Sequence, residues 1–338
     1  MTFDVEIDKL FEPAQNAVAQ KRIPCAALGV IAPDGQRFVR ASGFAQIEPE
    51  LVPFDQSMWF DLASLTKVIF TTRRILELID AGHLNLDEKI ATYLPDLRQY
   101  DLSAPERALT LRALLSHQTH LPAVEPLYTL GQDAETLRAY VLQRAWKPGP
   151  SVYSDINFIL LGLVIERVTG KSLSHQPLAE GLSFSPPAEH AVATELCSWR
   201  GRVMRGAVHD ENAYALGGAA GHAGLFGTVD GVLDHASLIV SGSGLSGELA
   251  KAMMTPQFET RTLGWEINHS GWHGGEGHSV HTIGHLGFTG TGLWIDVERG
   301  YAWTLLTNRV HPSRHTDTGI MALRRETGRR VAALFSQH

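Results

Sequence analysis

Apolar residues recur at helical spacing along one stretch of the chain that also carries a serine and a lysine. Between residues 65 and 79 the apolar or methyl-bearing side chains fall three or four positions apart, which predicts an amphipathic helix. The pattern ends at Gly82, a residue type common just beyond helix C-termini. Ser64 and Lys67 flank the apolar stripe about 60° apart at the start of this helix, so their side chains can touch and open onto a cleft.

Short apolar runs near both ends of the chain predict β-strands, whereas helical spacing prevails between them. The run at residues 26–32 precedes an Asp34-Gly35 pair and a second run, a pattern typical of a β-hairpin. Further strands are expected in the last third, before a closing helix. The predicted strands there are residues 264–267, 281–285, 291–296 and 301–307, and the helix is 316–335.

This order of elements indicates an α/β (α+β) fold with one sheet made from both chain ends. We expect residues 1–80 and 230–338 to form the sheet domain and residues 81–229 to form a mainly helical inserted subdomain. A catalytic cleft would then lie between the two parts.

Composition and charge narrow the range of partners. The net charge of −7 over 338 residues gives no electrostatic basis for binding nucleic acid or an anionic membrane. No apolar run reaches about 18 residues, and the acidic N-terminus lacks the features of an export signal. We therefore expect a cytoplasmic protein with a small-molecule substrate, while the oligomeric state stays open. Cys25 and Cys197 lack close spacing and are predicted to be reduced, structural thiols.

The Ser64 and Lys67 pair has a chemical use. A serine hydroxyl needs a neighbouring base, and a lysine whose pKa is lowered by burial can take its proton. Backbone N–H groups at a helix N-terminus favour the oxyanion of acyl transfer. Ser-x-x-Lys is nevertheless expected about once by chance in a chain of this length, so an exposed helical lysine is the simpler interpretation until other residues support the pair.

Two further segments provide candidate partners. Tyr153 follows a Pro-Gly loop and precedes a helix, where its phenol can face a cleft and act as a proton acceptor beside a lysine. His285 and Gly287 lie on a predicted edge strand, and the missing Cβ of Gly287 lets backbone approach an acyl group. The N–H groups of Phe288 and Ser64 could together form an oxyanion hole. Taken singly, such a tyrosine is more often a packing residue, and such a histidine is more often an ordinary core or surface residue.

In order and spacing, these three segments resemble the signature motifs of the serine β-lactamase and penicillin-binding-protein superfamily, closest to class C β-lactamase-related esterases and peptidases. Residues 114–122 are similar to the family's Leu-Leu-Thr-His-Thr-Ser-Gly-Leu-Pro segment, and the resemblance covers about residues 20–310. It implies an antiparallel sheet flanked by helices. It also implies that Ser64 is acylated, that Lys67 and Tyr153 share the proton transfers, and that the backbone of Ser64 and Phe288 binds the oxyanion.

Two departures from the family pattern bear on the substrate. His285-Leu286-Gly287 stands where class C β-lactamases have Lys-Thr-Gly, so the cation that grips a substrate carboxylate is missing unless His285 is protonated. Asp155 replaces an asparagine amide, which removes a donor and adds a negative charge. We therefore expect an esterase or an amidase/peptidase acting on a small ester, amide or peptidoglycan-derived substrate, with a weak β-lactamase or D-alanyl-D-alanine carboxypeptidase as the alternative.

Two competing hypotheses concern the mechanism. One is a catalytically silent binding or sensing domain of the same fold, and the other is a metal-dependent hydrolase. We expect His209 and His222 to line the cleft, and the chain holds 16 histidines in all. The side chains expected to contact substrate are Asp155, His285, Gly287, His209 and His222. The sequence contains no His-Glu-x-x-His motif, so we expect no metal or other cofactor and interpret His209-Asp210 as a hydrogen-bonded pair that shapes the pocket.

Overall fold

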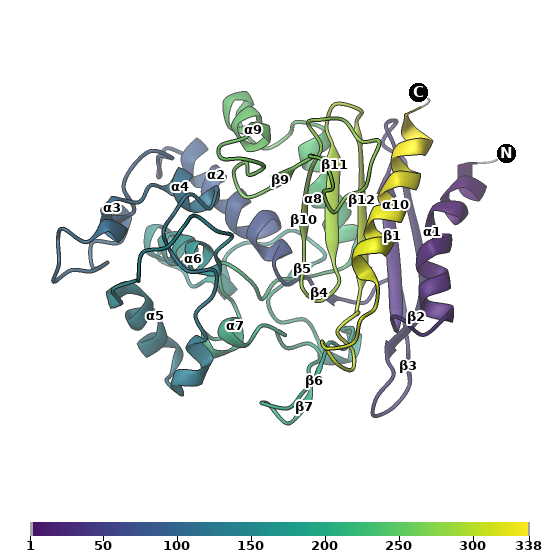
Figure 1. Ribbon diagram of the computed structural model, residues 1–338, viewed down its shortest axis with the longest axis horizontal. Coiled ribbons are helices and arrows are strands. Elements are labelled where there is room, and N and C mark those ends of the chain that lie inside the picture. Colours follow the sequence, from purple (N-terminus) through teal and green to yellow (C-terminus); the bar gives the residue numbers. More distant parts are fainter. Residues whose placement is uncertain (1–2, 337–338) are drawn as a thin grey trace.

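One antiparallel sheet, drawn from both ends of the chain, dominates the computed structural model, which describes residues 3–336. Figure 1 shows this sheet, whose strand order is β3-β2-β1-β12-β11-β10-β9. Its strands are β1 (Cys25–Ile31), β2 (Arg37–Gln46), β3 (Val52–Pro53), β9 (Glu266–Ile267), β10 (Ile283–Leu286), β11 (Gly292–Asp296) and β12 (Tyr301–Thr307). All neighbouring pairs are antiparallel. Because β1 pairs with β12, the predicted sheet built by both chain ends is confirmed.

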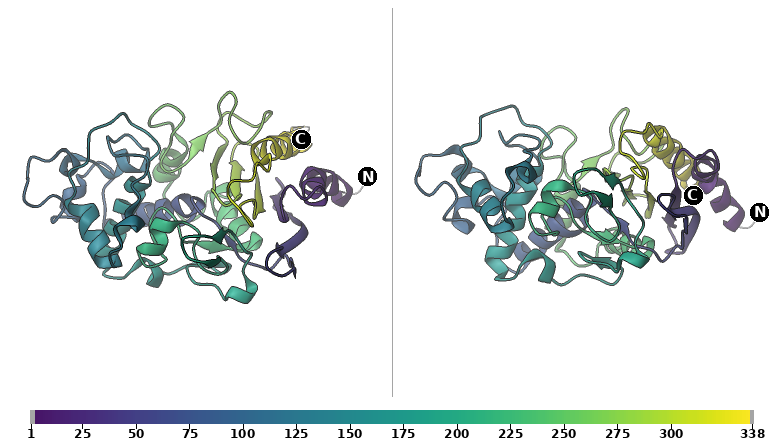
Figure 2. Two further views of the ribbon diagram at one scale, coloured as in Figure 1. Left: turned by 60° about the horizontal axis from the view of Figure 1, so that its bottom comes forward. Right: turned by 90° about the horizontal axis from the view of Figure 1, so that it is seen from below.

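Helices cover both faces of the sheet. Alternate β1 side chains, such as Leu28, pack in a cluster with α1 (Phe3–Ala19) and α10 (Ile320–Phe335), which lie side by side in Figures 1 and 2. The other β1 side chains, such as Ala27, belong to the cluster that includes α8 (Val229–Val240). A strand covered on both faces must be apolar throughout, which accounts for the continuous apolar run in the sequence.

The middle of the chain is mainly helical and lies away from the two termini (Figure 1). Its central helix is α6 (Asp155–Thr169), most of whose side chains are buried. The other helices here are α3 (Ile90–Tyr93), α4 (Leu111–Leu115), α5 (Ala134–Gln143), α7 (Glu211–Ala215), and the 3₁₀ helices η2 (Pro105–Ala108), η3 (Leu127–Leu130), η4 (Leu173–His175) and η5 (Ala188–His190). The domain boundaries at residues 80/81 and 229/230 stay a prediction, and residues 1, 2, 337 and 338 of the expected sheet domain lie outside the described part.

Short strands and three more helical segments complete the chain. A three-stranded sheet has the order β4-β8-β5 and a hairpin pairs β6 with β7. These elements are β4 (Phe60–Asp61), β5 (Leu182–Ser183), β6 (Leu196–Cys197), β7 (Arg202–Val203), β8 (Phe226–Gly227), the π-helix η1 (Lys67–Thr72), α2 (Arg73–Asp80) and α9 (Gly247–Met254).

The helix expected over residues 65–79 is present, but it begins differently. Its first part is the π-helix η1, and regular α-helix follows from Arg73. The predicted end is confirmed, since Gly82 has a φ of +75° and its N–H bonds to the carbonyl of Ile79. Cys25 and Cys197 are both buried and unpaired, as predicted.

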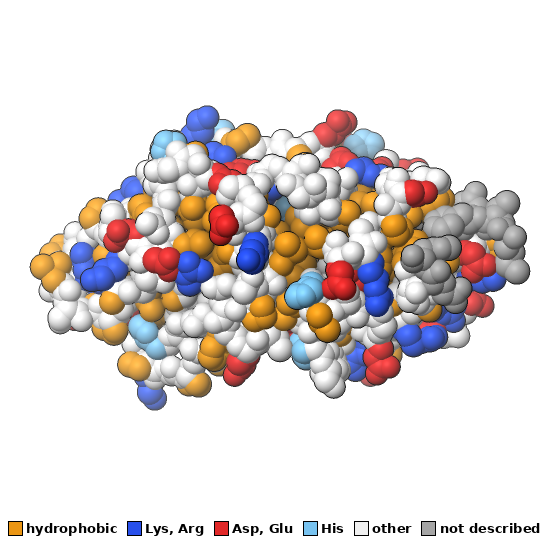
Figure 3. Space-filling model, turned by 90° about the horizontal axis from the view of Figure 1, so that it is seen from above, with side chains coloured by type: hydrophobic (Ala, Val, Ile, Leu, Met, Phe, Trp, Pro, Cys, Tyr) orange, Lys and Arg blue, Asp and Glu red, His pale blue; other side chains and the backbone are white. Residues whose placement is uncertain are grey.

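The surface gives two facts about partners. In the face shown in Figure 3, Lys and Arg side chains are interspersed with Asp and Glu. Between residues 3 and 336, no helix is both long and apolar enough to cross a lipid bilayer.

Candidate functional site

The loop before η1 holds Ser64 in a constrained position. Asp61, at the end of β4, is buried and accepts hydrogen bonds from the N–H of Ala63 (2.8 Å) and of His209 (2.6 Å). Ala63 has a φ of +48°, a left-handed conformation that costs free energy for a residue with a Cβ. Thr66 fixes the other side of the turn, because its Oγ1 accepts from the N–H of Leu225 at 3.1 Å. Ser64 is therefore held in place from both sides.

Lys67 is fully buried next to this serine. Its Nζ lies 2.9 Å from Ser64 Oγ, 3.1 Å from the carbonyl oxygen of His222 and 2.8 Å from Asp155 Oδ1. An ammonium group has three N–H donors, so each of them has an acceptor here. The structure thus brings the predicted serine and lysine into direct contact.

The protonation of Lys67 differs from the sequence-based expectation. Burial by itself lowers the pKa of a lysine, but the Asp155 carboxylate and the Tyr153 side chain outweigh that effect and raise the pKa of Lys67 above its ordinary value. The expected lysine with a lowered pKa is therefore wrong for this resting structure. Here Lys67 is a charged donor to Ser64.

Tyr153 lies beside this pair at the N-terminal end of α6. Lys67 Nζ is 5.0 Å from the centre of its ring. Two imidazole rings flank the phenol, with ring centres at 4.6 Å for His117 and 5.8 Å for His285. Ser64, Lys67 and Tyr153, which are far apart in the sequence, thus meet at one place.

His117 packs against the ring of Tyr153. The sequence did not single it out as a site residue. Its Nδ1 accepts a hydrogen bond from the N–H of Ser154 at 3.0 Å, which fixes the backbone next to the tyrosine. It also lies 3.2 Å from Asn157 Nδ2. The segment that resembles Leu-Leu-Thr-His was the available signal, but its contact with Tyr153 depends on the fold.

The third predicted motif closes the pocket along β10. Strand β9 pairs only with Ile283 and Gly284, so among the described residues the His285 half of β10 has no strand partner on that side. His285 Nδ1 lies 2.9 Å from the carbonyl oxygen of Leu286, which can only accept, so Nδ1 carries the hydrogen. Burial, together with the charges of Lys67 and others, holds the pKa of His285 well below its usual value. His285 is thus neutral and supplies no cation.

Gly287 and Phe288 place backbone next to Ser64. A Cβ on Gly287 would lie 2.0 Å from Thr291 Oγ1 and 2.5 Å from the carbonyl oxygen of Leu62, so only glycine fits. Within residues 3–336 the backbone N–H groups of Ser64 and Phe288 donate no hydrogen bond. Both are available for an oxyanion.

The structure rearranges the expected His209 and Asp210 pair. His209 Nε2 lies 3.3 Å from Glu195 Oε2, and the histidine does not line the pocket. Asp210 does line it, with its Oδ1 2.9 Å from His222 Nε2. The predicted hydrogen bond between the adjacent residues is therefore wrong, because the main chain at Asp210 starts α7 and turns the two side chains toward different partners. His222 reaches the site through its carbonyl oxygen, which accepts from Lys67.

Asp155, Asp210 and His222 offer ligand atoms within 4.8 Å of one another, a spacing that suits a metal ion. The Lys67 ammonium group already contacts Asp155 and the backbone of His222, so the chain provides the positive charge at this point. A metal ion would have to displace that lysine from Ser64. We therefore assign no metal here.

These residues surround a pocket of about 410 Å³. Its lining includes residues that the sequence did not indicate, above all Arg261 and Glu266. They belong to no motif, and the fold brings them to the site because Glu266 begins β9 and Arg261 lies in the turn before it. Burial works against the ionised form of Glu266, yet His273 and Arg261 hold the pKa of this carboxyl below its usual range. The lining residues are Ser64, Tyr153, Asp155, Asp210, Arg261, Glu266, His273, His285, Leu286 and Phe288.

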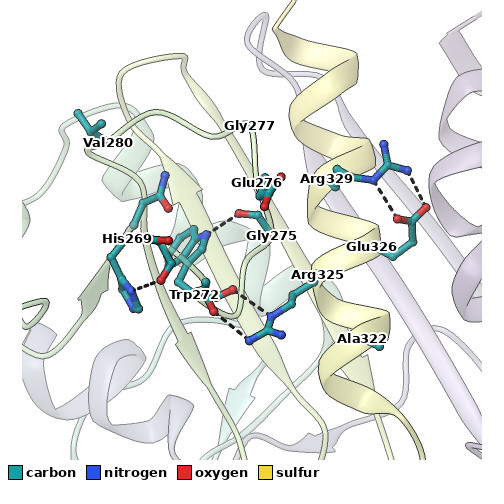
Figure 4. A pocket seen from close by; sticks show the side chains of 13 residues that line it. His269, Trp272, Gly275, Glu276, Gly277, Val280, Ala322, Arg325, Glu326 and Arg329 are labelled. Atoms are coloured by element: carbon teal, nitrogen blue, oxygen red, sulfur yellow. Dashed lines mark hydrogen bonds and ion pairs between the residues drawn. The ribbon is translucent and has the colours of Figure 1, made fainter.

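A larger groove of about 740 Å³ lies between α10 and the loop after β9 (Figure 4). Its arginines already have partners. Arg325 donates to the carbonyl oxygens of Trp272 and Gly271, and Arg329 pairs with Glu326. This groove shows no chemistry comparable to that around Ser64.

Comparison with known proteins agrees with the fold. Residues 7–326 match the family model described as Beta-lactamase. The chain is 30% identical over 307 residues to a putative D-alanyl-D-alanine carboxypeptidase of Escherichia coli K12, covering 75% of this chain and 69% of that protein. It is 29% identical over 303 residues to an N-acetylmuramyl-L-alanine amidase of Bacillus subtilis strain 168, covering 75% and 68%. The chain belongs to the β-lactamase family.

A solved class C β-lactamase superposes with a TM-score of 0.73 at 16% identity, covering 95% of each chain. That likeness establishes the shared fold and confirms the predicted antiparallel sheet flanked by helices. Together with the family match, it identifies the protein as a serine hydrolase of the β-lactamase type.

Proposed function

We propose that this protein cleaves a small amide or ester through a covalent acyl-enzyme on Ser64. The observation that carries the proposal is the 2.9 Å contact between Lys67 Nζ and Ser64 Oγ, in a pocket that Tyr153 also lines. The unbonded N–H groups of Ser64 and Phe288 support the same assignment, since an oxyanion needs donors that are free to turn to it.

Because Lys67 is charged, the proton transfers must be assigned to another side chain. A protonated lysine cannot accept the serine proton, so we assign that step to the side-chain oxygen of Tyr153, whose ring centre lies 5.0 Å from Lys67 Nζ. Ser64 Oγ attacks the carbonyl carbon, and the oxyanion lies between the two N–H groups. Tyr153 then returns the proton to the leaving group. Tyr153 then takes a proton from a water molecule, which attacks the acyl carbon. The bond to Ser64 Oγ breaks, and Tyr153 returns the proton to that oxygen, so that the acid leaves and Ser64 is restored.

The substrate we favour is an amide or ester derived from peptidoglycan. Two similar proteins carry names that refer to bonds at alanine, a D-alanyl-D-alanine carboxypeptidase and an N-acetylmuramyl-L-alanine amidase. A pocket of about 410 Å³ suits a small group of this kind. Weak β-lactamase activity is the second candidate, because the fold is that of a class C β-lactamase.

Labelling with a fluorophosphonate followed by intact and peptide mass spectrometry tests the acyl-enzyme. We expect one adduct, located on Ser64, which is lost in Ser64→Ala. Ser57→Ala is the matched control, because this serine is exposed and its Oγ bonds to nearby Asp55, and it should label like the wild type. Labelling of another residue contradicts the assignment. Failure of the wild type to react with any acylating probe favours a silent binding domain.

A further inference from the structure

Arg261 presents the accessible positive charge of the pocket. Lys67 is fully buried with all its donors engaged, whereas about a quarter of the Arg261 side chain is exposed. Its Nη1 lies 3.1 Å from Glu266 Oε2, and its Cζ lies 5.4 Å from the ring centre of Tyr153. Among the described lining residues, Arg261 is the charged group that can turn N–H donors toward a ligand next to the reacting groups.

We propose that Arg261 binds a carboxylate of the substrate, a role that the third motif cannot fill in this chain. The effect expected on turnover rests on the proposed function, whereas the binding of a carboxylate does not. A guanidinium group carries five N–H donors in a planar fork that matches a carboxylate, and the ion pair with Glu266 occupies only part of it. His285 offers no competing cation, because its ring is buried close to Lys67 and Arg261, where a further positive charge is disfavoured.

The other charges around the pocket are compatible with an anionic group. Asp155 and Asp210 also line the pocket, but each already has a partner, Lys67 at 2.8 Å and His222 at 2.9 Å. Glu266 is held by His269 Nε2 at 2.7 Å, which leaves it beside Arg261 as an orienting group. Arg261 therefore retains N–H donors for a substrate carboxylate, whereas the acidic side chains of the pocket are already paired.

A binding experiment tests Arg261 without any turnover. N-acetylalanine and its carboxamide, N-acetylalaninamide, are titrated against Ser64→Ala and against Ser64→Ala/Arg261→Met by ligand-detected NMR. We expect the double variant to bind the carboxylate at least about tenfold more weakly relative to the carboxamide, with Arg261→Lys intermediate. Equal changes for the two ligands, or none, overturn the proposal.

A kinetic experiment tests the same residue during turnover. The substrates are 3-carboxyphenyl butyrate and 3-carbamoylphenyl butyrate, which differ in charge but hardly in shape. We expect Arg261→Met to lower the ratio of their kcat/KM values about tenfold, mainly through KM, and Arg261→Lys to restore part of it. Arg325→Met, in the groove beside α10, is the matched control and should leave the ratio unchanged. An unchanged ratio in Arg261→Met overturns the proposal.

The two experiments separate this inference from the proposed function. If the wild type forms no adduct on Ser64, the acyl-enzyme mechanism fails, but the binding of N-acetylalanine still decides the role of Arg261. If the adduct forms and Arg261→Met leaves both ratios unchanged, the carboxylate site fails alone.

Discussion

Lys67 keeps its charge inside the protein because three acceptors surround its ammonium group. An unpaired buried cation would be neutralised, but the Asp155 carboxylate at 2.8 Å stabilises the charged form. Asp155 stands where class C β-lactamases have an amide, so the replacement affects the protonation of the lysine as well as the substrate. Lys67 can then align Ser64, but it cannot take the serine proton while Asp155 holds it charged.

We expect Lys67→Ala to lower kcat by about 10⁴-fold, since removing one member of such a unit costs about that much. It should also lower the free energy of unfolding by about 1–3 kcal/mol, because Asp155 loses its cation but is partly exposed. Adding Asp155→Asn should recover the stability and leave kcat low. Turnover of a p-nitrophenyl ester and urea unfolding measure the two effects.

Lys251→Ala, at an exposed position on α9, is the control for these measurements and should change neither value. If Lys67→Ala keeps more than about a tenth of the wild-type kcat, the lysine does not belong to the proton relay.

At the scale of elements, the site depends on the turn between β10 and β11 resting on the loop before η1. Thr289 Oγ1 donates to the carbonyl oxygen of Asp61 at 2.7 Å, and Thr291 Oγ1 donates to that of Leu62 at 3.1 Å. Gly287 allows this approach because it has no Cβ. The turn thus sets the distance between the N–H groups of Phe288 and Ser64.

We expect Gly287→Ala to lower kcat by about 10²-fold, because the turn must move away from the backbone of Leu62 and carry the Phe288 N–H with it. The clash should also lower the free energy of unfolding by about 1–3 kcal/mol. Gly247→Ala is the matched control, since a Cβ there meets nothing within 4 Å. Wild-type kcat in Gly287→Ala, measured on the same ester, would show that this turn does not position the oxyanion hole.

Local patterns in the sequence predicted the helices and strands well, but they did not predict the tertiary contacts between these elements. Periodicity located the helix after Ser64, but its π-helical start has nearly the same apolar spacing over one turn and was not distinguished. The partner of His209 was missed because Glu195 approaches it through the fold and no local spacing relates the two. The pKa of Lys67 likewise depends on Asp155, 88 positions further along, so the sign of its shift required the structure.

At the scale of the whole molecule, the fold buries many histidines without charging them. Burial lowers the pKa of a set of six histidines in different parts of the structure, and it holds the pKa of His235 at about 3. The set is His117, His235, His273, His278, His285 and His311. Each of these side chains must gain a proton when the chain unfolds in mild acid.

We expect the free energy of unfolding to fall as the pH drops from about 6.5 to 5. An unfolded histidine has a pKa of about 6.5, so below that pH the unfolded chain binds more protons than the folded one. Each histidine of the set then removes up to about 1.4 kcal/mol per pH unit, whereas above pH 6.5 their contribution to stability is fully present. Carboxylates with lowered pKa, such as Glu266, add to the loss only below about pH 4.5.

Urea unfolding of wild type and His235→Phe at several pH values between 5 and 7.5 measures this dependence. His235 is buried on α8 and stacks near Trp265 with ring centres 6.3 Å apart, so phenylalanine can occupy its place without a titratable group. The slope of unfolding free energy against pH should fall by up to about 1.4 kcal/mol per pH unit in this variant, and the exposed His83→Phe should keep the wild-type slope. An unchanged slope in His235→Phe would mean that this ring is already protonated when folded, contrary to its burial.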